Sequence, residues 1–186
     1  MKKIIVFIGS IFIIVFCLAT CGNTEKKWQE EVLLGNGQKM WVERTAKFSS
    51  GGELGGPGSL DDLMSTLTVI SKLDVQPPPV WRGSELSPIL LDYDRDEKSW
   101  VLLATYYMCD VWEKIGKPVP PYVQYKSVNN SWVRIPFDKK WLGTSANLTA
   151  GIVRNERDVV TAEYKVLFDA GSGEKYRKIV DFSKCE

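Results

Sequence analysis

Apolar and polar positions alternate along three stretches of the chain, and a short polar turn divides each stretch. The clearest turn is Asn36-Gly37, which lies between apolar-rich arms within residues 28–48. Asn-Gly supplies the two positive φ angles that a tight two-residue hairpin turn requires. Residues 88–108 repeat the arrangement, and so do residues 122–136, with Asn129-Asn130 at the turn. The pattern therefore predicts three antiparallel hairpins.

Residues 99–108 are apolar on both faces of the predicted strand. Two sets of side chains alternate along it: Trp100, Leu102, Ala104 and Tyr106 on one face, and Val101, Leu103, Thr105 and Tyr107 on the other. A strand with one face in water carries polar residues on that face, so a strand that is apolar on both faces is covered on both sides. We therefore predict that this strand lies at the centre of the sheet.

Two stretches have helical spacing. Residues 59–65 carry a serine cap and early acids, which predicts a short helix or turn that passes into a strand by about residue 68. Residues 158–170 are predicted to form a helix that Asn155 caps and Gly171 ends. With the hairpins, this predicts a mainly β fold, with α+β as the alternative. We expect an antiparallel sheet or small β-sandwich built from three hairpins, with one or two short helices.

Each return strand of the three hairpins begins with Trp-Val. The pairs are Trp41-Val42, Trp100-Val101 and Trp132-Val133. Their unequal spacing does not fit a repeat protein. We predict instead that each tryptophan packs across its hairpin against the outgoing strand.

The chain of 186 residues contains no histidine. Without an imidazole base or ligand, Ser-His-Asp and Cys-His catalysis and nearly all catalytic zinc sites are excluded. The 24 basic and 23 acidic residues give a formal net charge of +1, so charge gives no reason to expect nucleic acid as a partner. Carboxylates remain available, and a hydrolase that uses two of them stays open.

Two loops resemble ligand-binding motifs but differ from them at decisive positions. The glycine-rich stretch 51–58 is followed by Ser59, where a phosphate loop continues with Lys and Ser or Thr. The acids of 92–97 alternate as in a calcium loop, but its glycine position is Glu97 and its closing acid position is Leu103. We therefore expect no bound metal and no cofactor.

The N-terminus has the layout of an export signal. Lys2 and Lys3 precede an apolar run of about 16 residues, and 18–21 read Leu-Ala-Thr-Cys. This resembles the lipobox of bacterial lipoproteins, and the resemblance implies cleavage before Cys21, with a diacylglycerol on its thiol and an acyl chain on its amine. One alternative is a plain cleaved signal, which lacks an A-x-A site; the other is an uncleaved anchor, for which ~20 apolar residues are typical.

The lipoprotein resemblance divides the chain into a signal peptide at 1–20, a short tether at 21–27 and a single globular domain at 28–186. It implies lipid anchoring at the periplasmic face of a bacterial membrane, with that membrane as a partner. Residues 91–136 also resemble an uncharacterised kind of small exported bacterial protein, through Asp92-Tyr93-Asp94, Cys109-Asp110-x-Trp112, Pro120-Pro121-Tyr122 and Trp132-x-Arg134-x-Pro136. That kind has no activity from which a catalytic residue would follow.

Two cysteines remain for pairing if Cys17 leaves with the signal and Cys21 is acylated. They are Cys109 and Cys185. In an oxidising compartment a lone pair of cysteines tends to form a disulfide, and the alternative is two buried free thiols. We predict a disulfide between Cys109 and Cys185.

Aromatic side chains are numerous, with seven each of Trp, Tyr and Phe. We expect most of them to lie in the core or in hairpin pairs, because large aromatic side chains are largely buried. Trp112 and Tyr122 flank the proline-rich stretch 118–121 and are predicted to be exposed. With Tyr125 they form the candidate surface for contact with a partner.

These observations favour a non-enzymatic binding module for another envelope component, either a protein or a glycan. An immunity-type lipoprotein that protects against a periplasmic toxin is one specific form of this hypothesis. The alternative is a histidine-independent glycan or peptidoglycan hydrolase. It requires a cleft with two carboxylates roughly 5 to 10 Å apart, one of them with a raised pKa.

Overall fold

The three predicted hairpins are the framework of the computed structural model, which describes residues 23–49, 64–106, 109–150, 158–165, 178–181 and 185. Each hairpin consists of two antiparallel strands: β1 (Asn23–Leu33) with β2 (Lys39–Ser49), β5 (Leu86–Asp94) with β6 (Ser99–Tyr106), and β7 (Tyr122–Val128) with β8 (Ser131–Ile135). The Asn129-Asn130 turn has the predicted conformation, with φ angles of 49° and 58°, as a tight primed turn requires. The predicted two-residue turn at Asn36-Gly37 is wrong. Gly37 has a φ of 82°, whereas Asn36 does not have a positive φ. The Leu34 N–H donates to the Gln38 carbonyl at 2.9 Å, so three residues form this loop.

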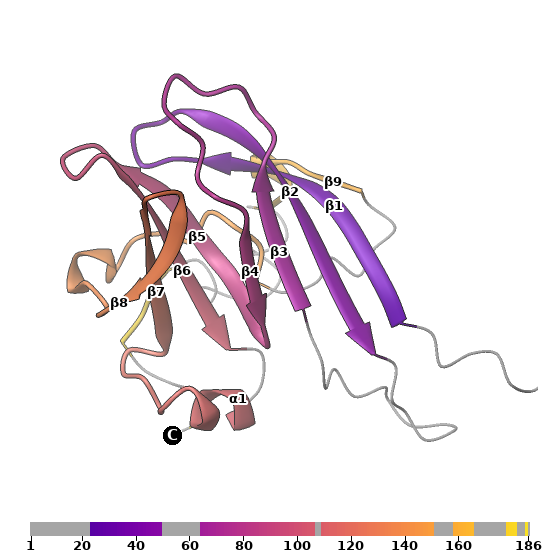
Figure 1. Ribbon diagram of the computed structural model, residues 1–186, viewed down its shortest axis with the longest axis vertical. Coiled ribbons are helices and arrows are strands. Elements are labelled where there is room, and N and C mark those ends of the chain that lie inside the picture. The colour runs from indigo at the N-terminus through magenta and orange to yellow at the C-terminus, as the bar shows by residue number, and fades with distance from the viewer. Residues whose placement is uncertain are drawn as a thin grey trace, which may run out of the picture.

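The strands form two sheets that pack face to face (Figure 1). The first has the order β4-β3-β2-β1-β9 and includes β3 (Met64–Val69), β4 (Trp81–Ser84) and the parallel strand β9 (Val159–Val160). The second has the order β5-β6-β7-β8 and is antiparallel throughout. Strand β4 continues through Glu85, with a φ of 60°, directly into β5, so one segment passes from the first sheet to the second. The mainly β, sandwich-like fold is confirmed.

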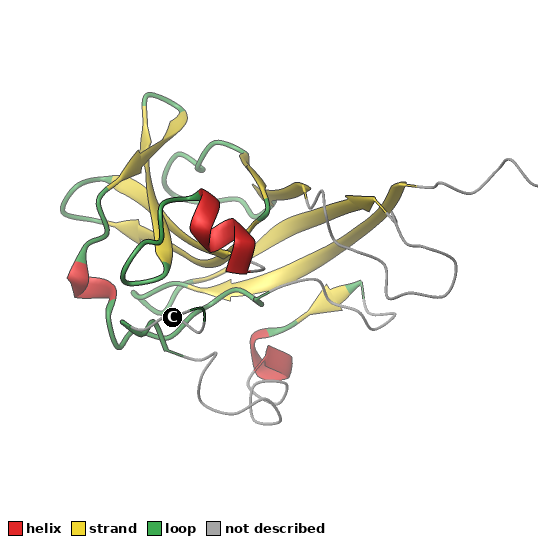
Figure 2. Ribbon diagram, turned by 90° about the horizontal axis from the view of Figure 1, so that it is seen from below, coloured by secondary structure: helices red, strands yellow, loops and turns green. Residues whose placement is uncertain are grey.

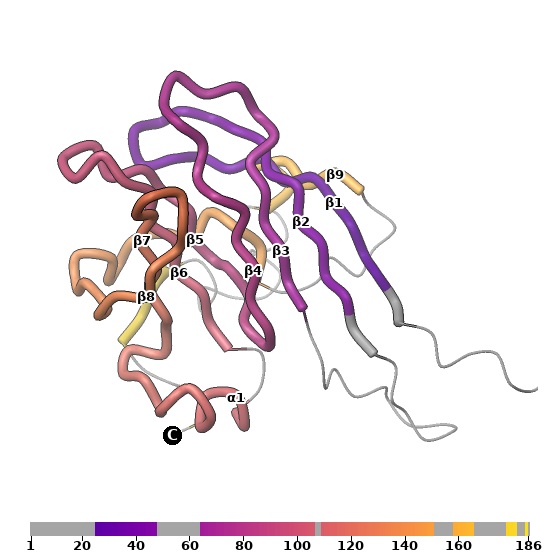
Figure 3. The backbone as a smooth tube through the Cα atoms, in the orientation of Figure 1, coloured from indigo at the N-terminus to yellow at the C-terminus, as the bar shows by residue number. Residues whose placement is uncertain are grey.

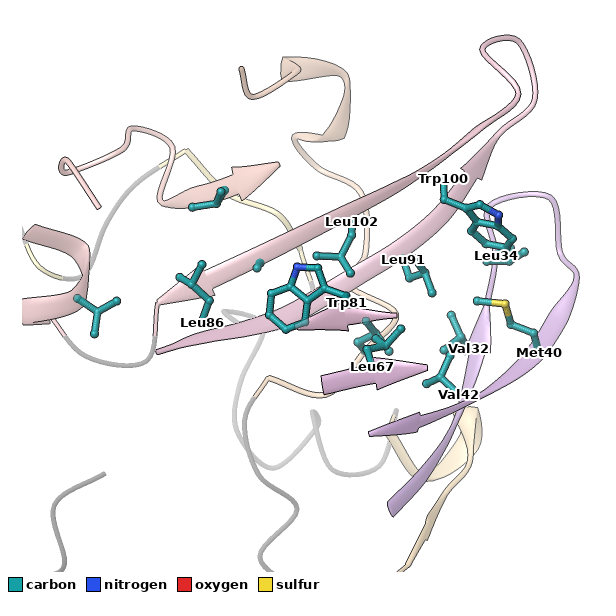
Figure 4. Packing of buried hydrophobic residues seen from close by; sticks show 14 residues of the cluster. Val32, Leu34, Met40, Val42, Leu67, Trp81, Leu86, Leu91, Trp100 and Leu102 are labelled. Carbon is teal, nitrogen blue, oxygen red and sulfur yellow. The ribbon is translucent and has the colours of Figure 1, made fainter. Parts of the chain in front are cut away.

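The main core fills the space between the two sheets (Figure 4). Its side chains come from both layers: Val32, Met40, Val42, Leu67 and Trp81 from the first sheet, and Leu91, Trp100, Leu102 and Val123 from the second. Val101 and Leu103 point the other way, into a second core with Tyr122, Trp141 and Ile179. Strand β6 is therefore covered on both faces and pairs with β5 and β7, which confirms the prediction that it is central.

The second core is closed by chain that follows β8. The 3₁₀ helix η2 (Lys139–Trp141) supplies Trp141. The Gly143 N–H donates to the Ile179 carbonyl at 2.9 Å, and the Ile179 N–H donates to the Thr144 carbonyl at 2.8 Å. These bonds hold Ile179 against the outer face of the second sheet. Figure 2 shows the helical segments, in red, at the periphery of the strands.

The three tryptophans that open the return strands have different roles. Trp100 packs across its hairpin, as predicted, edge-on to Tyr93 with ring centroids 5.1 Å apart. The indole N–H of Trp132 instead donates to the Pro79 carbonyl at 2.9 Å, and Ser127 is its small partner across the hairpin. Trp41 lies opposite Glu31. The shared packing mode predicted from the sequence thus holds for Trp100 and is wrong for Trp132.

The predicted helix boundaries are partly wrong. Strand β3 begins at Met64, earlier than the expected start near residue 68. In the predicted helix at 158–170, Val159–Val160 pair with β1 as strand β9, and residues 162–165 are helical. Two consecutive β-branched residues favour a strand where a partner edge is available. Asn155, Gly171 and the intervals 59–63 and 166–170 lie outside the described residues.

The tether predicted at 21–27 is mostly part of the sheet. Strand β1 begins at Asn23, and Asn23 to Lys27 pair with Ser49 to Thr45 of β2. The alternating residues Trp28, Glu30 and Val32 are buried, and the paired strand continues towards the N-terminus from them. Cys21 and the signal at 1–20 lie outside the described residues. Within the described chain, no helix is long and apolar enough to cross a membrane.

Candidate functional site

A pocket of about 380 Å³ opens at the end of strand β8. Its lining combines a proline-rich loop, the first residues of β7 and the residues that end β8: Pro118, Val119, Pro120, Tyr122, Val123, Gln124, Arg134, Ile135, Pro136 and Phe137. Consecutive residues of a strand point to opposite faces of the sheet, yet both Arg134 and Ile135 line the pocket. The pocket therefore opens at the edge of the sheet.

The apolar wall of the pocket is held in place by contacts behind it. Tyr122 and Phe137 stack with ring centroids 5.7 Å apart. The Tyr122 hydroxyl accepts a hydrogen bond from the Val180 N–H at 3.0 Å, and burial raises the pKa of this phenol. Val119, which also lines the pocket, is 67% exposed, the most exposed large apolar side chain among the described residues. The pocket thus has a fixed aromatic wall and an accessible aliphatic rim.

Strand β8 forms one edge of its sheet and offers unpaired backbone groups there. Val128 and Ser131 flank the two-residue turn, so they form a hydrogen-bonded pair, and such pairs recur at every second residue. The backbone N–H and C=O groups of Trp132 and Arg134 therefore point away from β7. Among the described residues, none forms a hydrogen bond to these outward groups.

The opposite edge of the same sheet, at β5, is closed. The Asn147 side chain accepts from the Leu91 N–H at 2.9 Å and donates to the Leu91 carbonyl at 2.8 Å. The backbone N–H groups of Asn147 and Leu148 donate to the Ile89 carbonyl at 3.1 and 3.0 Å. Exposed strand edges are usually blocked in this way because they pair readily with other chains. The open β8 edge is therefore the exception within this sheet.

Arg134 is an exposed cation at the pocket, and it has no ion pair among the described residues. Other basic residues in this part of the chain do have acidic partners. Lys117 contacts Glu113 at 3.0 Å and Lys140 contacts Asp94 at 2.8 Å. An unpaired guanidinium offers a planar set of donors that matches a carboxylate.

The predicted contact residues have a different arrangement from the one expected. Trp112 is only 6% exposed, and its indole N–H donates to the Pro118 carbonyl at 3.1 Å, so its predicted exposure is wrong. Tyr122 is buried as well, at 8% exposed, so its predicted exposure is also wrong, although the residue does line the pocket. Tyr125 is half-buried and lies edge-on to Trp81 with ring centroids 6.2 Å apart. An indole or phenol beside a proline loop packs under that loop because most of its surface is apolar.

The two cysteines predicted to pair lie together. Helix α1 (Cys109–Lys114) begins at Cys109, whose sulfur is bonded to that of Cys185, and the two Cα atoms are 5.4 Å apart. The bond joins the helix that follows β6 to the C-terminal end of the chain. It lies outside the set of residues that line the pocket.

A second polar cluster, which the sequence did not predict, is buried between the sheets. Glu30 and Arg44 are 0% and 1% exposed, and their Oε2 and Nη1 atoms are 3.0 Å apart. Lys165 reaches the same carboxylate, with Nζ 3.2 Å from Oε1. Burial raises the pKa of Glu30, but Arg44, Lys165 and a hydrogen bond from Thr149 outweigh it and bring the pKa below its ordinary value. Glu30 and Arg44 are closed to solvent, and the cluster links β1 and β2 to the residues around Thr149 and Lys165.

The described carboxylates give no support to the hydrolase hypothesis, which requires a carboxyl group with a raised pKa. Where a carboxyl pKa is shifted in the described part of the chain, as for Glu30, Asp94 and Glu163, it is lowered. For Asp94 the main cause is the hydrogen bond from Lys140. A general acid needs a raised pKa. The described ranges also contain no group of three or more Cys, Asp or Glu side chains placed to hold a metal ion.

Comparisons with known proteins assign no family. A scan against protein-family models finds no match, and searches of curated proteins and of solved structures find none either. The resemblance of 18–21 to a lipobox, and that of 91–136 to small exported bacterial proteins, therefore stay predictions.

Proposed function

We propose that the protein is a membrane-anchored binding module of the bacterial envelope that recognises another envelope protein. Acylated Cys21 would hold it at the periplasmic face of a membrane. The recognition surface is the open edge of β8 together with the pocket at its end. Binding involves no covalent chemistry.

The observation that carries this proposal is the difference between the two edges of the second sheet. Asn147 and Leu148 bond to outward backbone groups of Leu91 and Ile89 on β5. The described chain leaves the outward backbone groups of Trp132 and Arg134 on β8 unpaired. A free strand edge is a template for pairing with another polypeptide. The adjoining pocket, at about 380 Å³, lies at the small end of ligand sites. A side chain of a bound protein fits that size.

A glycan is a less suitable partner for this surface. Sugar rings usually stack on exposed aromatic faces. The exposed large apolar side chains of the described chain are all aliphatic or methionine, among them Leu33, Val119 and Val133. The candidate contact surface predicted from the sequence does not include an exposed Trp112, because that residue is buried. The chemistry of the surface therefore favours a polypeptide.

The start of β1 supports a position close to the membrane. Only Gly22 separates Cys21 from Asn23, the first residue of β1. One or two extended residues reach at most about 7 Å. An acyl chain on Cys21 would therefore hold the folded domain against the lipid surface without a flexible spacer.

Site-specific crosslinking in cells tests the proposal. A photo-crosslinking amino acid replaces Val119 at the pocket rim, and in a matched strain it replaces Val159, which is 49% exposed on the other sheet. We expect a crosslinked envelope protein from position 119 and not from position 159. We also expect Cys21→Ala to abolish palmitate labelling and to reduce the crosslink. Equal crosslinking from both positions, or none from 119, would overturn the proposal.

A further inference from the structure

We infer that β8 receives an extended, acidic segment of the partner protein as an added strand. Its backbone pairs with Trp132 and Arg134, one acidic side chain binds the Arg134 guanidinium, and a neighbouring aliphatic side chain enters the pocket. This inference rests on the proposed function, because it names the chemistry of the partner at the same surface.

The backbone geometry selects an extended segment. The outward N–H and C=O groups of Trp132 and Arg134 are separated by one residue, Val133, whose own backbone groups point to β7. An added strand presents donors and acceptors with this same two-residue period. A helix or a globular loop satisfies its carbonyls internally and does not match the edge. Strand addition fits this spacing.

The charge at the edge selects an acidic segment. Arg134 is exposed and has no carboxylate within the described chain. The sequence of β8 is Ser-Trp-Val-Arg-Ile and contains no acid. A second copy paired through its own β8 would therefore bring arginine but no carboxylate to this edge. A partner segment with Asp or Glu supplies the missing charge.

The end of the edge limits where the segment can pair and what it can place there. Pro118 and Pro120 in the loop and Pro136 after β8 have no backbone N–H. Pairing consequently stops at Arg134, and the next contact is made by a side chain against Pro136 and the Tyr122–Phe137 stack. The Pro136 ring and the Tyr122–Phe137 stack give this part of the pocket an apolar surface, while the polar side chains of Gln124 and Arg134 line other parts of it. An aliphatic side chain such as Val, Leu or Ile is the complementary group.

A peptide library tests the acidic preference. Full-length protein in detergent micelles is presented with a positional-scanning library of heptapeptides, and the enriched sequences are resynthesised for binding titrations. We expect Asp or Glu at one position and an aliphatic residue beside it. Arg134→Gln should weaken binding of the enriched peptide about threefold to tenfold. Arg82→Gln is the matched control, because Arg82 is also an exposed arginine on a strand and also lacks an ion pair within the described residues.

Alternate N-methylation tests strand addition itself. The enriched peptide is made in two forms, methylated on its odd-numbered or on its even-numbered amides. Only alternate N–H groups of an added strand face β8, so one form should lose at least about tenfold in affinity, while the other binds nearly as well as the parent. Equal loss in both forms would overturn strand addition. An enriched sequence without an acid, or an unchanged affinity in Arg134→Gln, would overturn the inferred contact between Arg134 and an acidic side chain.

The outcomes separate this inference from the proposed function. If position 119 crosslinks an envelope protein but the library yields no acidic extended peptide, the binding module stands and the inference falls. If position 119 gives no crosslink, the proposed function falls. Sedimentation of the purified protein tests whether a second copy of the chain occupies β8. A dimer that the enriched peptide dissociates would indicate self-pairing on β8 and would also overturn the inference.

Discussion

Replacement of Glu30 by glutamine tests the buried cluster that joins the first sheet to the C-terminal half of the chain. The carboxylate is surrounded by donors: Arg44 Nη1 at 3.0 Å, Lys165 Nζ at 3.2 Å, the Thr149 N–H at 2.6 Å, the Thr149 hydroxyl at 3.1 Å and the Trp28 indole N–H at 3.4 Å. Glutamine keeps the shape of the side chain. It replaces one acceptor oxygen by an NH₂ donor and removes the negative charge.

The expected cost follows from what remains in the core. Arg44 is 1% exposed and the Lys165 side chain is 11% exposed, so both cations lose their buried counter-charge without gaining water. Removing one partner of a buried ion pair costs about 3 to 5 kcal/mol. The new NH₂ group also faces at least two donors, whichever way the amide is turned. We therefore expect Glu30→Gln to lower the free energy of unfolding by about 3 to 5 kcal/mol.

Urea titration of the purified protein, followed by tryptophan fluorescence, measures this change. The matched control is Glu25→Gln, since Glu25 also pairs with a basic residue of β2, Lys47, but with side chains 51% and 59% exposed. An exposed pair contributes about 0 to 1 kcal/mol. If the Glu30 variant lost no more than the Glu25 variant, the cluster would not stabilise the contact between the first sheet and the C-terminal half of the chain.

The same pair of proteins gives a pH test. The pKa of Glu30 is lowered from its ordinary value of 4.5, so its carboxylate stabilises the fold fully above about pH 4.5. That contribution is lost as the pH falls through the lower pKa of the folded state. Since the glutamine variant lacks this titration, the difference in unfolding free energy between the two proteins should shrink below about pH 4.5. A difference that stays constant or grows on acidification would contradict the lowered pKa.

Two further changes test the closed edge and the cysteine pair. Asn147→Leu should cost about 2 to 3 kcal/mol in urea titrations, because the backbone groups of Leu91 and the carbonyl of Leu33 lose their partner; an unchanged midpoint would contradict that role. Reduction of the bond between Cys109 and Cys185, which are 76 residues apart, should cost about 2 to 4 kcal/mol. Alkylation and intact mass with and without reductant measure its presence, and equal labelling in both would disprove it.

The fold was predictable where local residues determine local structure. Asn36-Gly37 and Asn129-Asn130 determine where two hairpins turn, and the two apolar faces of 99–106 indicate a strand covered on both sides. These signals depend only on neighbours in sequence. The assignment of hairpins to sheets was not predictable. It depends on the passage from β4 to β5 through Glu85, and a single residue with a positive φ has no signature in the sequence.

The candidate site depends on contacts between distant residues, and here the sequence was a poor guide. Trp112 packs beneath its proline loop instead of lying exposed. Asn147 closes the β5 edge from 56 residues away in sequence. Glu30 and Arg44 occupy alternating inward positions of β1 and β2, where the pattern predicts apolar side chains. A charge at such a position was the one available signal for the buried cluster.

The β8 edge and the start of β1, next to the proposed lipid attachment at Cys21, lie far apart in the molecule. The start of β1 lies on the opposite side of the molecule from the β7–β8 hairpin (Figure 3). A lipid at Cys21 would hold the β1–β2 end near the membrane, because β1 begins at Asn23. The β8 edge would then face away from the attached end and remain accessible to a segment of a periplasmic protein. Because Asn147 closes β5, β8 is the edge of that sheet that the described chain leaves open to a partner. Anchoring through Cys21 and recognition at β8 would therefore use different surfaces.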